Sequence, residues 1–95
     1  MRLLWTPRAS RQRQEAIDYI AEQDPITALA VLDRIEQQTD VLQQQPDLGR
    51  PGRKRGTREL VISRTPFIVV YRVRPKAKCV ELLTLLHGSQ QWRRL

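Results

Sequence analysis

Twice near its start, the chain places a helix-capping residue directly before a proline. Thr6-Pro7 and Asp24-Pro25 each combine an N-cap side chain with the residue that is preferred at the first position of a helix. The second pair also ends the helix before it, because a residue that precedes proline is disfavoured in helical geometry. Apolar residues recur at helical spacing after both pairs. The chain therefore predicts two amphipathic helices with a very short connection, one from Pro7 to about Gln23 and one from Pro25 to the stop at Gln45-Pro46.

The hydrophobic period changes from helical spacing to alternation after residue 57. Prolines separate the alternating runs, as turn residues do between antiparallel strands. The strands that we expect are Arg2 to Thr6, Arg58 to Ile62, Phe67 to Val73 and Lys78 to Leu86. The third of these is apolar on both faces, which is typical of a central strand. The sequence predicts a single α+β domain over residues 1–95, in the order β-α-α-β-β-β, with the helical hairpin packed on a small, mainly antiparallel sheet.

The composition excludes several classes of protein. The chain has 95 residues, enough for one core, and its 40% hydrophobic content is too high for a disordered chain with this charge. Its single cysteine, Cys79, cannot form a disulfide within the chain or a multi-cysteine metal site. The sequence shows no apolar run that could span a bilayer and no segment that resembles a secretory signal. We therefore expect a cytoplasmic protein without membrane contact.

Positive charge is concentrated in the second half of the chain. Residues 1–49 contain five Lys/Arg and eight Asp/Glu, a balance of −3, whereas residues 50–95 contain twelve Lys/Arg and two Asp/Glu, a balance of +10. The basic half opens with GRPGRKRG, which we expect to form a loop from Gly49 to Gly56. Such asymmetry indicates a polyanionic partner, and RNA is the candidate. The residues that we expect to bind it are Arg50, Arg53, Lys54, Arg55, Arg72 and Lys78.

His87 is the only histidine, and it follows the last predicted strand. A histidine titrates near neutral pH, so in a cationic groove it could serve as a general acid or base. Cleavage of RNA through its own 2′-OH needs such proton transfer and positive charge on the phosphate, but no metal ion. Arg64 and Arg58 carry guanidinium groups that suit phosphate oxygens, so with His87 they form the candidate catalytic set. The competing interpretation is a histidine that ends a strand and arginines that are solvated.

Three further residues have specific expected roles. Glu59 and Glu81 are the only acids in the basic half, and we expect each to pair with an arginine of a neighbouring strand. Trp92 could stack on a base, although the expected role is to anchor the end of the chain against the sheet.

The sequence contains no phosphate-binding loop, nucleophile elbow, metal-ligand spacing or dinucleotide motif. We expect no cofactor and no metal.

The order of four segments resembles the RelE/ParE superfamily of type II toxins. These segments are WTPRA at the end of the first strand, GRPGRKRGTREL, TPFIVVYRV and LLHGSQQW. The resemblance covers nearly the whole chain. It implies a small cytoplasmic toxin that a cognate antitoxin holds inactive in a toxin–antitoxin hetero-oligomer.

The superfamily implies two different targets. RelE-like members cut mRNA on the ribosome, and the positions here that match their active residues are Lys54 or Arg55, Arg58, Arg64 and His87. Gly88-Ser89-Gln90 departs from their pattern, because several nucleases carry a tyrosine or an arginine there. ParE-like members inhibit DNA gyrase, and the long helical hairpin is closer to that branch. We expect an endoribonuclease whose partners are antitoxin, ribosome and mRNA, with non-enzymatic gyrase inhibition as the alternative.

Overall fold

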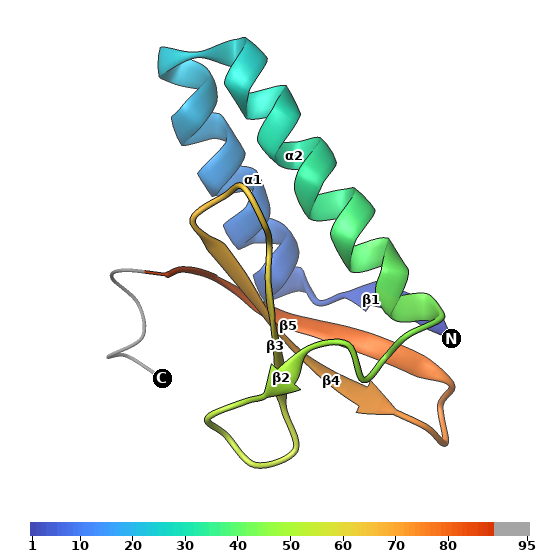
Figure 1. Cartoon of the computed structure of the whole chain (residues 1–95). Helices are drawn as coiled ribbons and strands as arrows, with labels where there is room; N and C mark the ends of the chain where they lie inside the picture. The colour runs from blue at the N-terminus through green and yellow to red at the C-terminus, as the bar shows by residue number, and fades with distance from the viewer. Residues whose placement is uncertain (89–95) are drawn as a thin grey trace.

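Two helices lie on one face of a five-stranded sheet in the computed structural model, which describes residues 1–88 (Figure 1). The elements are β1 (Arg2–Trp5), α1 (Pro7–Gln23), α2 (Pro25–Asp40), the 3-10 turn η1 (Val41–Gln43), β2 (Arg50–Pro51), β3 (Arg58–Val61), β4 (Phe67–Arg74) and β5 (Cys79–His87). The α+β class and the packing of the hairpin on the sheet are confirmed. Within these residues, neither helix has both the length and the apolarity that a membrane span requires. Trp92 lies outside the described residues.

Both predicted caps form. The Thr6 hydroxyl accepts a hydrogen bond from the backbone N of Ala9 at 3.2 Å and begins α1. The Asp24 carboxylate accepts from the backbone N of Thr27 at 3.1 Å and from the Thr27 hydroxyl at 2.6 Å, which lowers the pKa of Asp24. The backbone N of Asp24 also donates to Ile20 O at the end of α1, so one residue connects the two helices.

The sheet has the strand order β1-β5-β4-β3-β2, so β4 is the central strand, as predicted. The neighbouring strands from β5 to β2 are antiparallel, whereas β1 lies parallel to β5 at the edge. The register places His87 opposite Phe67 where β4 begins. It places Arg58 opposite Tyr71, toward the other end of β4. The two ends of the sheet therefore carry different candidate residues.

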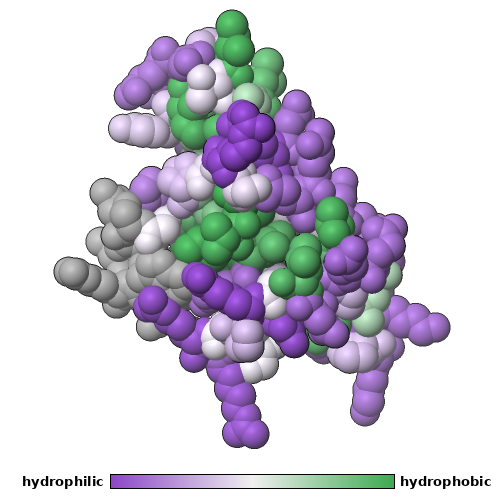
Figure 2. All heavy atoms as spheres, viewed as in Figure 1, coloured by the Kyte–Doolittle hydropathy of each residue, from purple (hydrophilic) through white to green (hydrophobic). Residues whose placement is uncertain are grey.

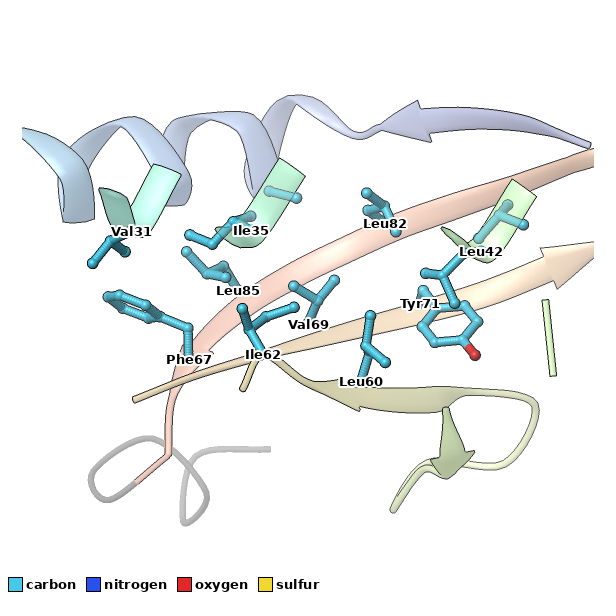
Figure 3. Packing of buried hydrophobic residues seen from close by; sticks show 12 residues of the cluster. Val31, Ile35, Leu42, Leu60, Ile62, Phe67, Val69, Tyr71, Leu82 and Leu85 are labelled. Carbon is cyan, nitrogen blue, oxygen red and sulfur yellow. The ribbon is translucent and has the colours of Figure 1, made fainter. Parts of the chain in front are cut away.

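A hydrophobic core fills the space between the hairpin and the sheet (Figure 3). Figure 3 shows Val31, Ile35 and Leu42 from the helical segment facing Leu60, Ile62, Phe67, Val69, Tyr71, Leu82 and Leu85, which come from β3, the residue after it, β4 and β5. Burial of each such side chain contributes about 1.5–3 kcal/mol, so this layer holds the helices on the sheet. A smaller buried cluster of Ile68, Val70 and Leu86 accounts for the apolar character of the second face of β4.

Several details differ from the sequence predictions. The second helix is predicted to run to the stop at Gln45-Pro46, but α2 ends at Asp40 and the 3-10 turn η1 follows it. The loop predicted from Gly49 to Gly56 contains the short strand β2, whose Arg50 pairs with Glu59. Lys78 was predicted to begin the last strand, but it lies in the preceding turn with φ +54°, and β5 begins at Cys79. His87 was placed after that strand, yet it is its last residue, because the register with β4 extends to Phe67.

Candidate functional site

Two of the three candidate catalytic residues lie together at one end of the sheet, and the third lies further along it. His87 ends β5 opposite Phe67, and Arg64 lies in the turn that leads into β4 at that same end. Arg58 is opposite Tyr71, four residues further along β4, which corresponds to about 13 Å at 3.3 Å per residue. The structure therefore brings His87 and Arg64 to one end and separates Arg58 from them. Their catalytic roles stay predictions.

The guanidinium of Arg58 binds backbone atoms of the segment that leads into β2. Its Nη1 donates to the carbonyl oxygen of Gly49 at 2.7 Å and to that of Asp47 at 3.4 Å. Its Nη2 lies 3.7 Å from the exposed Asp47 carboxylate. Three interactions with one segment give this arginine a structural role.

The hydroxyl of Tyr71 makes hydrogen bonds to the same segment from inside the core. It accepts a hydrogen bond from the backbone N of Gly49 at 2.8 Å and donates to the carbonyl oxygen of Pro46 at 2.7 Å. A Cβ atom on Gly49 would lie 2.6 Å from this hydroxyl, so the close approach requires glycine. Burial raises the pKa of Tyr71. Together with Arg58, the tyrosine fixes the start of the basic segment.

The turn that carries Arg64 is held against α2. Arg64 adopts φ +65°, and its carbonyl oxygen accepts a hydrogen bond from Arg34 Nη1 at 3.2 Å. Gln38 bonds Ser63 in both directions, because its Oε1 accepts from the Ser63 backbone N at 2.8 Å and its Nε2 donates to the Ser63 carbonyl at 3.1 Å. The backbone of this turn is thus fixed, while the Arg64 residue itself is exposed to solvent.

His87 lines a groove of about 390 Å³ between α1 and the start of β4. The groove is lined by Gln12, Glu15, Ala16, Tyr19, Ile20, Pro66, Phe67, Leu85 and His87. The ring of His87 meets that of Phe67 edge-on, with centroids 5.9 Å apart. Most of the lining is apolar, and Glu15, Tyr19 and His87 supply its ionisable groups. Such a groove suits apolar side chains of another protein, with polar contacts along its rim.

Gln12 joins the helix to the sheet beside this groove. Its Oε1 accepts from the backbone N of Leu85 at 2.9 Å and from the Thr84 hydroxyl at 2.8 Å. β1 ends at Trp5, whose partner in β5 is Leu82, so the glutamine replaces a neighbouring strand where the β5 edge would otherwise be open. The groove has no signature in the sequence, since its residues come from segments that are far apart in the chain.

The residues expected to bind a polyanion divide into two groups. Arg50 lies 3.1 Å from the buried carboxylate of Glu59. Arg72 lies 2.9 Å from the partly exposed carboxylate of Glu81. These ion pairs with acids on neighbouring strands are as predicted, and hydrogen bonding from Arg72 lowers the pKa of Glu81. The other group, Arg53, Lys54, Arg55 and Lys78, lies in two exposed turns. The Arg50 and Arg72 side chains are also 54% and 45% exposed, but each is held by an acid of the neighbouring strand.

The described residues contain no group of three or more His, Cys, Asp or Glu side chains that could hold a metal ion. Of the candidate catalytic residues, the groove contains only His87, and its other ionisable side chains are those of Glu15 and Tyr19. Its chemistry therefore rests on one imidazole, one carboxylate and one phenol.

Comparison with known proteins places this arrangement in a family. Residues 3–92 match the family model described as ParE toxin of type II toxin-antitoxin system, parDE. The protein named Putative toxin Y4kP, from Sinorhizobium fredii, is 44% identical over 91 residues, which are 96% of this chain and 92% of that protein.

Two solved structures have the same fold. A chain from the structure titled Chromosomal ParDE TA system from P. aeruginosa is 30% identical with a TM-score of 0.82, and the match covers 92% of this chain and 95% of that one. A chain of the toxin-antitoxin complex RelBE2 from Mycobacterium tuberculosis is 21% identical with a TM-score of 0.58, over 90% and 88% of the two chains. The second likeness supports the fold alone. On the family match and the identity to Y4kP, this chain belongs to the ParE toxin family of type II toxin-antitoxin systems.

Proposed function

We propose that this toxin inhibits DNA gyrase by binding, without breaking a bond in RNA. The observation that carries the proposal is the separation of the candidate catalytic residues, since Arg58 lies about 13 Å along β4 from the His87 end. The guanidinium of Arg58 is also engaged by the carbonyl oxygens of Gly49 and Asp47. A phosphate at His87 would lack this arginine.

The comparisons support the same branch of the superfamily. The family model is that of a ParE toxin, and the likeness to the ParDE structure is greater than that to the RelBE2 structure in both identity and TM-score. Because the fold is common to both branches, the site has to carry the distinction.

Ribosome-dependent mRNA cleavage is the second candidate. It is favoured by the position of His87 in a groove and by the presence of Arg64 at the same end of the sheet. In this alternative His87 transfers a proton and Arg64 stabilises charge on the phosphate. The set is smaller than expected from the sequence, because Arg58 is absent from it.

Two assays on the purified chain separate these candidates. The first follows supercoiling of relaxed plasmid by gyrase and ATP, and we expect the toxin to abolish it. The second maps message ends by primer extension in a cell-free translation system, with His87→Ala as control, and we expect no new ends. Ribosome-dependent ends that vanish in His87→Ala, with supercoiling intact, would reverse the assignment.

A cognate antitoxin is the second partner in this proposal. The structures that resemble this chain come from toxin-antitoxin systems. Three large apolar side chains on the hairpin, Tyr19, Ile26 and Leu29, are 66%, 81% and 65% exposed, and Tyr19 also lines the groove. An unpaired apolar surface of this kind commonly marks a protein interface. We expect Ile26→Ser with Leu29→Ser to weaken antitoxin binding by more than tenfold in calorimetry, whereas unchanged affinity would place the interface elsewhere.

A further inference from the structure

Positive charge gathers at the end of the sheet opposite His87. The β2–β3 loop, residues 52–57, lies beyond Arg58, and the β4–β5 turn, residues 75–78, joins Arg74 to Cys79. β1 also begins at this end, because Arg2 pairs with Cys79. The cations gathered here, which we call the basic end, are Arg2, Arg53, Lys54, Arg55, Arg74, Lys76 and Lys78. Figure 1 shows both connections on the side of the sheet away from the hairpin tip, and in Figure 2 long hydrophilic side chains project on that side.

The two connections of the basic end flank Val73. Val73 lines one hollow with Gly56 and Thr57, and a second hollow with Lys76 and Ala77. The strands of the sheet are spaced by about 4.8 Å, so five of them make an end about 19 Å wide. One ligand can therefore contact both connections.

Most of this charge is not neutralised within the protein. Glu81 is bound by Arg72 and Arg74, whereas Glu59 is bound by Arg50. In the part of the chain that the structure describes, no ion pair involves Lys54, Arg55, Lys76 or Lys78, and all four are exposed. The acids of this half are already paired, so the basic end presents an excess of positive charge to a ligand.

Hydrogen bonds hold both connections in shape. In the loop, the backbone N of Gly52 donates to Thr57 O at 2.8 Å, and the Thr57 hydroxyl donates to Lys54 O at 2.6 Å. In the turn, the backbone N of Lys78 donates to Pro75 O at 3.1 Å. The cations are therefore presented on a fixed framework, which lowers the entropy lost on binding a rigid ligand.

The side chains at this end distinguish between kinds of polyanion. Proteins that hold unpaired nucleotides stack the bases on aromatic rings. Across residues 1–88, the aromatic side chains lie elsewhere: Tyr71 and Phe67 are buried, Trp5 lies under Arg13, and Tyr19 is on the hairpin. Double-stranded DNA, in contrast, presents one negative charge per about 1.7 Å of its axis. A protein can bind its backbone with cations alone, without aromatic side chains.

From these observations we infer that the basic end binds the phosphate backbone of duplex DNA and so holds the toxin on the DNA on which gyrase acts. The inference rests on the proposed gyrase function for the choice of DNA. It assigns the loop and the turn to one ligand, and it separates DNA contact from the groove at the His87 end.

The test measures binding of the purified chain to a labelled DNA duplex of about 30 base pairs by fluorescence anisotropy, between about 50 and 200 mM salt. One variant combines Lys54→Gln with Arg55→Gln in the loop, and a second combines Lys76→Gln with Lys78→Gln in the turn. The matched control combines Arg8→Gln with Arg11→Gln, two exposed cations of α1. Each variant loses two charges, so net charge is the same in all three.

We expect the loop and turn variants each to bind more weakly and to reduce the slope of log K against log salt by about 2, since each phosphate contact contributes about 1. The control should keep the wild-type slope. Equal losses in all three variants would mean non-specific attraction and would overturn the inference, as would tighter binding to single-stranded RNA of the same length. Because the anisotropy assay contains no gyrase, a wild-type chain that fails to bind DNA but inhibits gyrase would overturn this inference alone. A wild-type chain that binds DNA through the basic end but leaves gyrase active would overturn the proposed function.

Discussion

The Tyr71 hydroxyl offers a sharp test of how the basic segment is fixed. Its ring is fully buried in the core, and its oxygen bridges the backbone N of Gly49 and the carbonyl of Pro46 at 2.8 and 2.7 Å. Tyr71→Phe retains the ring and removes one oxygen atom. Any loss of stability therefore measures the bridge and not the packing of the ring.

The expected cost follows from the groups that lose their partner. The Gly49 N–H is buried, and a buried donor without a partner costs about 1–3 kcal/mol. The Pro46 carbonyl is only partly buried, so water can replace the hydroxyl there and the loss is about 0.5–1 kcal/mol. We expect the free energy of unfolding to fall by about 1.5–4 kcal/mol and Tm to fall by roughly 6–32 °C.

Urea denaturation followed by circular dichroism gives this free energy directly. The control is Tyr19→Phe, since Tyr19 is 66% exposed on the hairpin and should change stability by less than about 0.5 kcal/mol. If Tyr71→Phe were as stable as this control, the hydroxyl bridge would contribute nothing and our explanation of the loop would be wrong.

The remaining predictions concern titration and capping. Burial raises the pKa of Tyr71 in the folded protein. The stability that this shift contributes is therefore present below the ordinary pKa of 10.0 and is lost as pH rises through the raised pKa of the folded state. Tyr71→Phe lacks this loss, so its alkaline denaturation should begin at a higher pH than its lower stability alone would suggest. Hydrogen bonding from Arg72 lowers the pKa of Glu81 in the folded protein. The stability that this shift contributes is present above the ordinary pKa of 4.5 and is lost as pH falls through the lowered pKa of the folded state. Thermal melts of Glu81→Gln should therefore show a smaller fall of Tm at acid pH than those of the wild type. Thr6→Ala removes the cap of α1 and the hydroxyl bond to Leu82 O and should cost about 1–2 kcal/mol by urea titration, whereas Thr6→Ser should not.

The helices and the central strand were predictable because their signals are local. The Thr6 cap, the Asp24 cap and the prolines after them act within one helical turn, so the sequence alone indicates where α1 and α2 begin. The apolar faces of β4 likewise identify the strand that is buried on both sides.

The site was less predictable because its contacts join distant segments. β2 has only two residues and depends on Arg50 pairing with Glu59 across the sheet, which no local pattern indicates. The role of Arg58 depends on a segment folded back toward β3. The groove depends on Gln12 reaching Leu85, 73 residues away in the chain. Spacing identified candidate residues, but only tertiary structure shows that His87 and Arg64 share one end of the sheet while Arg58 lies further along it.

The proposed function is tested most directly by titrating the purified toxin against a fixed amount of gyrase and resolving plasmid topoisomers. We expect supercoiling to fall in proportion to the ratio of toxin to gyrase and to be independent of incubation time, since the toxin acts by binding. We also expect His87→Ala to inhibit as the wild type does. Undiminished supercoiling at a large excess of folded toxin would contradict the proposal, and growth arrest that depends on His87 would then point to RNA.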